Sequence, residues 1–502
     1  MDISKCIVRC GPVVFVMAAT LLGSASLQAA TPPDIAATCT ALTGSKAFSQ
    51  TQITHAAIVP AANNLPAYCE VQGVIRAVPG SEIGVVYRLP ENWNHKLLAL
   101  GGGGWMGNVT LQAAAEGLGK GYATMQTDGG HTSGTVFDAS PWAINADGSA
   151  NKVKLEDFSH RAIHLMTERG KQVAKTYYGN KASRSYYQGC STGGRMGMME
   201  TQRYPKDFDG VIAGAPVYTL QTQTSAQLRT RAFSAPGARL SNAHLALINK
   251  AVLAACDARD GAADGVLRDP RACDFDPAVL ACKAGQSPDS CLTPAQIAAM
   301  KKVYAGEKTQ GGAVASYPLD MGGETGWARF VPATAAGDPG TNSGGLYALR
   351  GPLLGDGNFN MDSFTADTVP KVRSSWLADV YEARDADITR FVRNGGKLIL
   401  WHGGNDPGPS PRGTVEYFEA ALKATRNGNS SVRLFLAPGV GHCSGGAGPD
   451  RIDWLTALDN WVEKKTAPEQ LPATKAGSTL AWNVCAYPKL PTGQADGTYA
   501  CR

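Results

Sequence analysis

The chain has 502 residues, of which 43% are apolar and 18% charged, so it can bury a large core and is not mostly disordered. Its formal charge of +5, from 47 basic and 42 acidic residues, is spread without a basic block, which disfavours nucleic acid as a partner. The lack of a long internal apolar run excludes a multi-span membrane protein and predicts no stable membrane insertion. At about 100–200 residues per domain, the length allows about three domains or one elaborated domain.

Residues 1–30 have the pattern of a secretory signal peptide. Lys5 and Arg9 precede an apolar stretch over Pro12–Leu22, and small residues follow as far as Ala29 and Ala30. The apolar stretch is too short to span a bilayer comfortably, although an uncleaved anchor is the alternative. We therefore expect a secreted or periplasmic protein.

Cysteine usage agrees with export. Two of the twelve cysteines lie in the predicted signal, and the other ten form the even set that disulfide-bonded exported proteins have. Proximity in the sequence suggests three local pairs: Cys256–Cys273, Cys282–Cys291 and Cys485–Cys501. The remaining four are Cys39, Cys69, Cys190 and Cys443, and spacing alone leaves the connectivity open. A zinc site is not favoured, because there is no CxxC pair and no cluster of histidines.

Short apolar runs that end in glycine alternate with helical patterns, which predicts an α/β fold with a parallel sheet. The first group has strands at Lys96–Leu100, Tyr122–Thr127, Ser185–Gln188 and Val211–Ala213, with helices over Phe158–Tyr178 and up to Arg203. The second group has a helix end at Ile388–Val392, strands at Lys397–Trp401 and Val432–Leu436, and a helix at Trp454–Lys464.

Between Tyr218 and Asp385 this alternation is lost, and the chain is rich in Ala, Gly, Asp and Pro. The simplest interpretation is one α/β domain formed by residues 31–217 and 386–502, with residues 218–385 inserted as a second domain. Two sequential domains followed by a tail are the alternative.

The strongest chemical signal is a G-x-S-x-G sequence at residues 189–193, between an expected strand and an expected helix. The glycines permit a tight turn that exposes the hydroxyl of Ser191, and the N–H of Thr192 would stand at a helix N-terminus, facing a developing oxyanion. The motif alone is weak in a chain with 58 glycines, but its strand–helix context strengthens it. We predict a nucleophilic Ser191, the alternative being a structural turn serine.

A serine nucleophile needs a base and an acid that orients the base. Asp406 and His442 both follow expected strands, in loops where α/β folds place their sites. The order Ser191, Asp406, His442 is that of α/β-hydrolases. His402 competes as the base, but it precedes the acid and is interpreted as a supporting histidine. Two other acids fit the order less well: Asp128 and Asp450.

A cysteine stands beside each of two predicted catalytic residues. Cys190 precedes Ser191, and Cys443 follows His442. A disulfide between these cysteines would hold the backbones of the nucleophile and the base together. The alternative is that each cysteine pairs elsewhere.

The Cys-Ser, Asp and His-Cys arrangement resembles the tannase and feruloyl esterase family of α/β-hydrolases. The resemblance runs from about Cys39 to the end and rests on Gly189–Arg195, Phe208–Pro216, Trp401–Gly403 with Asp406, and Gly441–Cys443. It implies an α/β-hydrolase fold with a large lid inserted after the nucleophile helix, which residues 218–385 would form. It also implies a small-molecule substrate, an ester of an aromatic acid of feruloyl, galloyl or terephthaloyl type.

A loop in the predicted lid is similar to a calcium-binding loop of the family. Its carboxylates, Asp257, Asp260 and Asp264, lie within eight residues of a loop over 256–266 that holds two glycines, and clustered oxygen donors suit Ca²⁺. The resemblance implies these side chains, with the carbonyls of Ala262 and Val266, as ligands of a structural Ca²⁺. The spacing is not that of an EF-hand, and a solvated acidic turn is the alternative.

A second oxyanion donor is expected in the glycine run over residues 101–104, because glycine lets the backbone approach an oxyanion closely. The family has a glycine-rich loop here, which implies Gly103 or Gly104 as the partner of Thr192. No G-K-[ST] follows, so a phosphate site is not favoured.

The acyl pocket is expected in the lid over residues 344–359, where Arg350 and Tyr347 are candidate substrate contacts. The predicted function is a secreted serine carboxylesterase that acts through an acyl-enzyme. Two alternatives stay open. One is a general short-chain esterase or lipase, and the other is a catalytically silent binding protein on the same fold.

Overall fold

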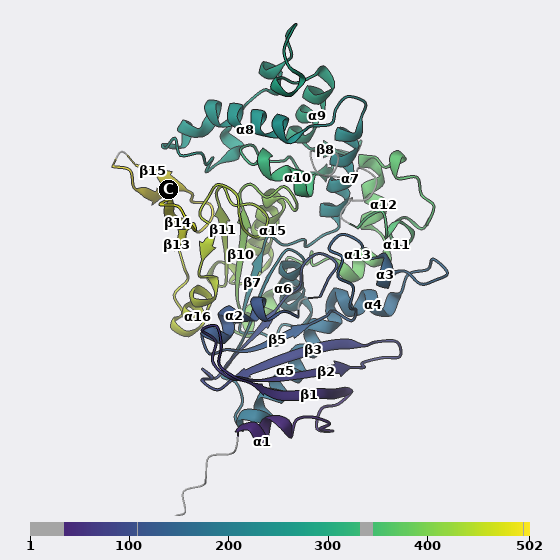
Figure 1. The fold of residues 1–502 in the computed structure, drawn as a ribbon, viewed down its shortest axis with the longest axis vertical. Helices are drawn as coiled ribbons and strands as arrows, with labels where there is room; N and C mark the ends of the chain where they lie inside the picture. The colour runs from purple at the N-terminus through teal and green to yellow at the C-terminus, as the bar shows by residue number, and fades with distance from the viewer. Residues whose placement is uncertain (1–34, 108, 332–344, 495) are drawn as a thin grey trace, which may run out of the picture.

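The computed structural model is built around a nine-stranded sheet (Figure 1). The strand order is β1-β2-β3-β5-β4-β6-β7-β10-β11. The structure describes residues 35–107, 109–331, 345–494 and 496–502, so the predicted signal peptide lies outside the described residues. Six strands form the parallel part: β5 (Ala123–Thr127), β4 (Lys96–Leu100), β6 (Arg184–Cys190), β7 (Gly210–Gly214), β10 (Lys397–Gly403) and β11 (Val432–Ala437). These strands lie where the sequence predicts them.

Helices cover both faces of the parallel strands, which explains why these strands are apolar at successive positions. Alternate residues of β4, such as Leu97 and Leu98, enter two different cores. The core on one face is completed by α5 (Ala162–Tyr178), α6 (Thr192–Arg203) and α15 (Pro411–Ala424). The core on the other face is completed by α2 (Leu111–Gly119) and α16 (Trp454–Lys464).

The helix expected over Phe158–Tyr178 differs in its first turn. Residues Asp157–Arg161 form a π-helical turn between α4 (Lys152–Glu156) and α5. The carbonyls of Phe158 and Ser159, at this turn, accept hydrogen bonds from the buried guanidinium of Arg195 on α6. The π turn therefore lies where a buried cation is solvated by backbone oxygen.

Several strands were missed by the sequence analysis. β1 (Thr51–Val59), β2 (Tyr68–Ile75) and β3 (Ile83–Pro90) extend the sheet in antiparallel order at the bottom of Figure 1. A small C-terminal sheet contains β12 (Arg451–Ile452), β13 (Gln470–Thr474) and β14 (Ala481–Cys485). A hairpin of β15 (Pro491–Gly493) and β16 (Tyr499–Cys501) follows. Partial burial gives β1 and β13 a weaker apolar signal than that of the parallel strands, whereas β3 is buried at nearly every position and was missed all the same.

The segment between β7 and β10 has two parts, which pack into different cores. Its first part includes α7 (Gln221–Ser234), α8 (Asn242–Cys256) and α9 (Pro294–Ala305) and has its own core around Phe233, Ile248 and Trp327. Figure 1 shows α8 and α9 at the top, beyond the sheet. The second part contains α11 (Arg350–Leu354), α12 (Val369–Arg373) and α13 (Trp376–Tyr381), and its apolar side chains join the core of the sheet. Among the described residues, no helix is long and apolar enough to cross a bilayer.

Candidate active site

Ser191 occupies a strained turn between β6 and α6, with φ of 63° and ψ of −126°. The turn is tight because Gly189 and Gly193 meet there. A Cβ on Gly189 would lie 2.6 Å from the carbonyl carbon of Gly193, and a Cβ on Gly193 would lie 2.7 Å from the Gly102 oxygen. The Ser191 N–H donates to the carbonyl oxygen of Gly214 at 2.9 Å, which holds the turn against the end of β7. The strain is thus maintained by packing that only glycine permits.

Ser191, His442 and Asp406 form a continuous chain of hydrogen bonds. The Oγ of Ser191 lies 2.8 Å from Nε2 of His442, and Nδ1 of His442 lies 2.6 Å from Oδ2 of Asp406. The three residues follow β6, β10 and β11, whose C-terminal ends share one edge of the sheet. In this arrangement Nδ1 donates to the carboxylate, so Nε2 is the atom that can take the serine proton.

The carboxyl group of Asp406 is fully buried and ionised. Burial by itself raises its pKa, but the charge of His442 and the hydrogen bonds from His402 and His442 outweigh burial and lower the pKa to about 2. The N–H of Gly408 also donates to Oδ1 of Asp406 at 2.8 Å. Asp406 is therefore held as a carboxylate in one orientation, as an acid that orients a catalytic histidine must be.

His402 supports the acid and does not replace His442. Its Nε2 lies 3.2 Å from Oδ2 of Asp406 and 3.1 Å from the carbonyl oxygen of Pro409, so Nε2 carries the proton. The hydroxyl of Thr414 then donates to Nδ1 at 2.8 Å. His402 thus gives Asp406 a second imidazole donor, which shares Oδ2 with His442.

The two other candidate acids accept hydrogen bonds from backbone N–H groups of nearby loops. Asp128 accepts the N–H groups of Gly84 and Gly130 at 2.9 and 2.8 Å, and Asp450 accepts the N–H of Gly445 at 2.7 Å. Burial raises the pKa of Asp128 to about 6 despite those two hydrogen bonds. Neither carboxylate has a hydrogen bond to His442 among the described contacts.

The described part of the chain contains five disulfides, and one of them joins the loop of Ser191 to the loop of His442. Cys190 and Cys443 are bonded, with their Cα atoms 6.0 Å apart, so the residues before Ser191 and after His442 are covalently linked. Cys39 is bonded to Cys69. The local pairs are Cys256–Cys273, Cys282–Cys291 and Cys485–Cys501.

A small cavity of about 70 Å³ opens at Ser191 and His442. Trp105, Val136 and Phe137 line it from loops of the α/β domain, and the α7 residues Thr222, Gln223, Ala226 and Arg229 line it from the inserted segment. Gly104 and Thr192 also line it, whereas Gly103 is not among the lining residues. Gly104 has φ of +57° and lies next to Val136, so a side chain there would clash.

Sequence reasoning missed these cavity walls. Trp105 directly follows the glycine run, which was a usable signal, but the α7 residues carried none. Arg229 is buried and donates to the carbonyl oxygens of Pro407 and Gly408 at 3.0 and 3.2 Å. Burial lowers the pKa of Arg229 to about 10, although Asp406 and Asp320 oppose the effect. The inserted segment therefore braces the loop that carries Asp406.

Residues 344–359 contribute little to this cavity. Leu346, Leu349 and Leu353 are buried in the main core rather than exposed to a ligand. Tyr347 and Arg350 line a separate hollow of about 960 Å³, which shares only Phe137 with the cavity at Ser191. Within that hollow the guanidinium of Arg350 lies 4.2 Å from the centre of the Tyr347 ring and donates to the Tyr347 carbonyl oxygen at 2.8 Å.

The acidic loop of the inserted segment is tightly organised. Oδ2 of Asp257 accepts the N–H of Gly265 at 2.8 Å, whereas Oδ1 of Asp257 is buried without a hydrogen-bond partner. Asp260 and Asp264 both pair with the buried guanidinium of Arg268. Burial raises the pKa of Asp260 although Arg268 opposes it. The orphaned Asp257 oxygen and the all-oxygen donor set fit a hard cation.

Comparison with known proteins identifies the family to which this chain belongs. A family model for tannase and feruloyl esterase matches residues 69–502. A probable feruloyl esterase from Arthroderma benhamiae is 35% identical over 432 residues, covering 80% of this chain and 78% of the relative. A mono(2-hydroxyethyl) terephthalate hydrolase from Piscinibacter sakaiensis is 31% identical over 518 residues, covering 86% and 83%. The crystal structure of feruloyl esterase B from Aspergillus oryzae matches with a TM-score of 0.83 at 24% identity, covering 93% of this chain and all of that one.

The mixed sheet, the turn at Ser191 and the site at the strand ends define an α/β-hydrolase. The chain belongs to the tannase and feruloyl esterase family, and it is a carboxylic ester hydrolase.

Removing the Cys190–Cys443 disulfide should lower turnover as well as stability. In a Cys190→Ala/Cys443→Ala variant, we expect kcat to fall about 10–100-fold, because small misplacements of catalytic groups have effects of that size. The free energy of unfolding should fall by about 2–5 kcal/mol. Steady-state kinetics with nitrophenyl butyrate and urea unfolding measure the two effects. The matched control is Cys282→Ala/Cys291→Ala in the inserted segment, whose kcat should stay within about twofold of wild type. Equal kcat values for both variants would contradict the expectation.

His402 should act on turnover through Asp406. We expect His402→Leu to lower kcat roughly tenfold, the equivalent of about 1.4 kcal/mol, with little change in KM. Without the His402 donor the pKa of Asp406 should rise from about 2, which titration of the Asp406 carboxyl group by NMR can measure. His402→Gln keeps an N–H donor and should recover part of kcat. A His402→Leu enzyme with the wild-type kcat and an unchanged Asp406 titration would show that the contact has no role.

Proposed function

We propose that the protein is an exported serine esterase that hydrolyses esters of aromatic acids. The observation that carries the proposal is the hydrogen-bond chain Ser191–His442–Asp406, which opens into a cavity with the aromatic walls Trp105 and Phe137. The relatives named as feruloyl esterase and as mono(2-hydroxyethyl) terephthalate hydrolase support an aromatic acyl group. Five disulfides support export, because disulfides persist in oxidising compartments.

In the proposed reaction, Nε2 of His442 takes the proton of Ser191 as Oγ attacks the ester carbonyl carbon. The carboxylate of Asp406 stabilises the imidazolium that forms. The N–H of Thr192, at the start of α6, and a backbone N–H of the Gly103–Gly104 segment hold the oxyanion. His442 returns the proton to the departing alcohol, and water then hydrolyses the acyl-enzyme by the same route.

The site's geometry favours esters whose acid is flat. Trp105 also contacts Phe158 and Tyr381 through ring centroids 5.6 and 5.2 Å away, so it is a fixed wall. Offset or edge contacts with such a ring stabilise an aromatic ligand by about 0.5–1.5 kcal/mol beyond burial. The Arg350–Tyr347 hollow begins at Phe137, where it can receive the alcohol part of a larger ester.

A substrate panel tests the proposal on the chain with its disulfides formed. Methyl ferulate, methyl gallate and a terephthalate monoester should be hydrolysed, and Ser191→Ala should lower kcat by at least about 10⁴-fold. Ser149→Ala, at an exposed serine, is the control and should match wild type. Turnover of nitrophenyl butyrate alone would leave a short-chain esterase. Absence of turnover of every ester by folded protein would favour a binding role.

We also propose that the acidic loop binds a structural Ca²⁺. Asp257, Asp260 and Asp264 would hold it, with the carbonyls of Ala262 and Val266 as further ligands. A bound Ca²⁺ would compensate Asp257, because Arg268 already pairs with Asp260 and Asp264. The Cys256–Cys273 disulfide and the Tyr499 hydroxyl, which donates to Asp264 at 2.7 Å, also restrain the loop. No step of ester hydrolysis passes through this loop.

Calcium removal should reduce stability without altering the chemistry of the triad. After EGTA treatment we expect a lower Tm that Ca²⁺ restores and Mg²⁺ does not, with a gain of about 2.7 kcal/mol at 100 times the Kd. Asp257→Asn should abolish the restoration. Asp274→Asn, at an exposed carboxylate of the same segment, is the matched control and should keep it. If Ca²⁺ does not change the Tm of the wild-type protein, the loop is a solvated acidic turn and not a calcium site.

A further inference from the structure

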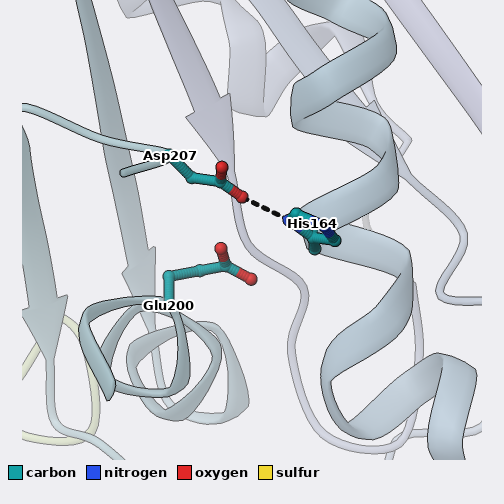
Figure 2. Close-up of side chains that lie close together, drawn as sticks. All are labelled: His164, Glu200 and Asp207. Carbon is teal, nitrogen blue, oxygen red and sulfur yellow. Dashed lines mark hydrogen bonds and ion pairs between the residues drawn. The ribbon is translucent and has the colours of Figure 1, made fainter. Parts of the chain in front are cut away.

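A second group of ligating side chains lies at the other end of the nucleophile helix. His164 on α5, Glu200 in the last turn of α6 and Asp207 in the turn before β7 each offer an atom within 4.8 Å of the other two (Figure 2). Glu200 lies nine positions after Ser191, which is about 13 Å along a helix axis. The cluster is therefore remote from the triad, and the proposed esterase mechanism leaves it without a function.

Glu200 has an unusual environment for a carboxylate. It is only 1% exposed, and neither of its oxygens has a hydrogen-bond partner among the described residues. Figure 2 shows its carboxyl group aimed at the space between Asp207 and His164. Burial, with Asp207 adding to the effect, raises the pKa of Glu200 well above its usual range. Glu200 faces the Asp207 carboxyl group, and the nearby cations Lys171 and Arg195 compensate its charge only in part. A proton or a bound cation is therefore needed in addition.

The two other members of the cluster are oriented by their neighbours. Nδ1 of His164 lies 2.6 Å from Oδ2 of Asp207, and the ring of His164 stacks on that of Tyr204 with centroids 3.9 Å apart. Tyr204 is in turn bonded through its hydroxyl to Nδ1 of His160 at 2.8 Å. The other ring nitrogen of His164 faces Glu168, 3.9 Å away. The contact between Nδ1 and Asp207 fixes the orientation of the ring, whereas the 3.9 Å between Nε2 and Glu168 is too long for a hydrogen bond.

Two of the three side chains, His164 and Asp207, line a hollow that is open to solvent, whereas Glu200 does not line it. The hollow has a volume of about 460 Å³ and is also lined by Glu168 and Tyr204. Its rim also carries three cations: Lys206, Arg390 and Arg393. These charges oppose the attraction of any cation, so binding must come from coordination bonds rather than from a negative surface.

We propose that His164, Glu200 and Asp207 form a binding site for a first-row divalent metal ion of the Zn²⁺ type. One imidazole and two carboxylates suit such an ion, whereas Ca²⁺ takes six to eight oxygen ligands. The double charge of the ion balances Glu200 and Asp207, and water from the hollow can complete the coordination. The site joins α5, α6 and the start of β7, so its role is to stabilise the support behind the nucleophile helix.

Titration of the full chain, without an affinity tag and with Ca²⁺ in excess, tests the site. Isothermal titration with Zn²⁺ should show one tight site, a rise in Tm and release of protons, because Glu200 must lose its proton to ligate. Co²⁺ should give a visible absorption band that Zn²⁺ abolishes. Activity is not needed as a readout, so failure of the esterase proposal would not affect this test.

Variants assign the binding to this cluster. Glu200→Gln and Asp207→Asn should each weaken Zn²⁺ binding by more than the roughly 10–100-fold that loss of a supporting contact causes. His55→Gln, at an exposed histidine of β1, is the control and should bind like wild type. Should Glu200→Gln fail to fold, Asp207→Asn and the wild-type Co²⁺ band remain decisive.

The proposal is overturned if wild type shows neither a Zn²⁺ site nor a Co²⁺ band, since Glu200 and Asp207 would then share a proton instead of a metal. Undiminished binding in Asp207→Asn would equally overturn it and place the ion elsewhere.

Discussion

The contact between the backbones of Gly189 and Gly193 is the constraint on which the site depends. It brings the end of β6 and the start of α6 so close that no side chain fits between them, and this closeness holds Ser191 at a positive φ. Hydrogen bonding to Gly214 and the disulfide from Cys190 to Cys443 keep the turn in place. The nucleophile is therefore positioned by packing and covalent linkage, before any substrate is bound.

The carboxylate of Asp406 is the second centre of organisation. It accepts from His442 on the side of the chemistry, from His402 behind, and from the N–H of Gly408. Arg229 of the inserted segment binds the carbonyl oxygens of Pro407 and Gly408, so the segment contributes to the acid loop as well as to the cavity wall. A displacement of α7 would thus alter both the shape of the acyl cavity and the support of the acid.

The nucleophile helix links two different environments. Its first turn faces the cavity at Ser191, where we propose that an oxyanion is held, whereas its last turn places Glu200 against Asp207 and His164 (Figure 2). The middle of the helix is anchored by the buried Arg195, whose guanidinium lies 4.2 Å from the centre of the Tyr381 ring. Because the helix is packed along its whole length, stabilising its remote end also stabilises the turn at Ser191.

The sequence by itself determined the parallel strands, the turn at Ser191 and the order of serine, acid and histidine, and it suggested the three local cysteine pairs that the structure confirms. These features follow from local patterns. Apolar runs that end in glycine mark the strands, and the glycines around Ser191 mark a tight turn. Only the tertiary structure decided which apolar residues line the cavity, since Leu346 and Leu349 are core whereas Trp105 and Phe137 are wall. It also decided that His402 supports Asp406 and that Glu200 faces His164. Such facts depend on what packs opposite a side chain, and that neighbour lies far away in the chain.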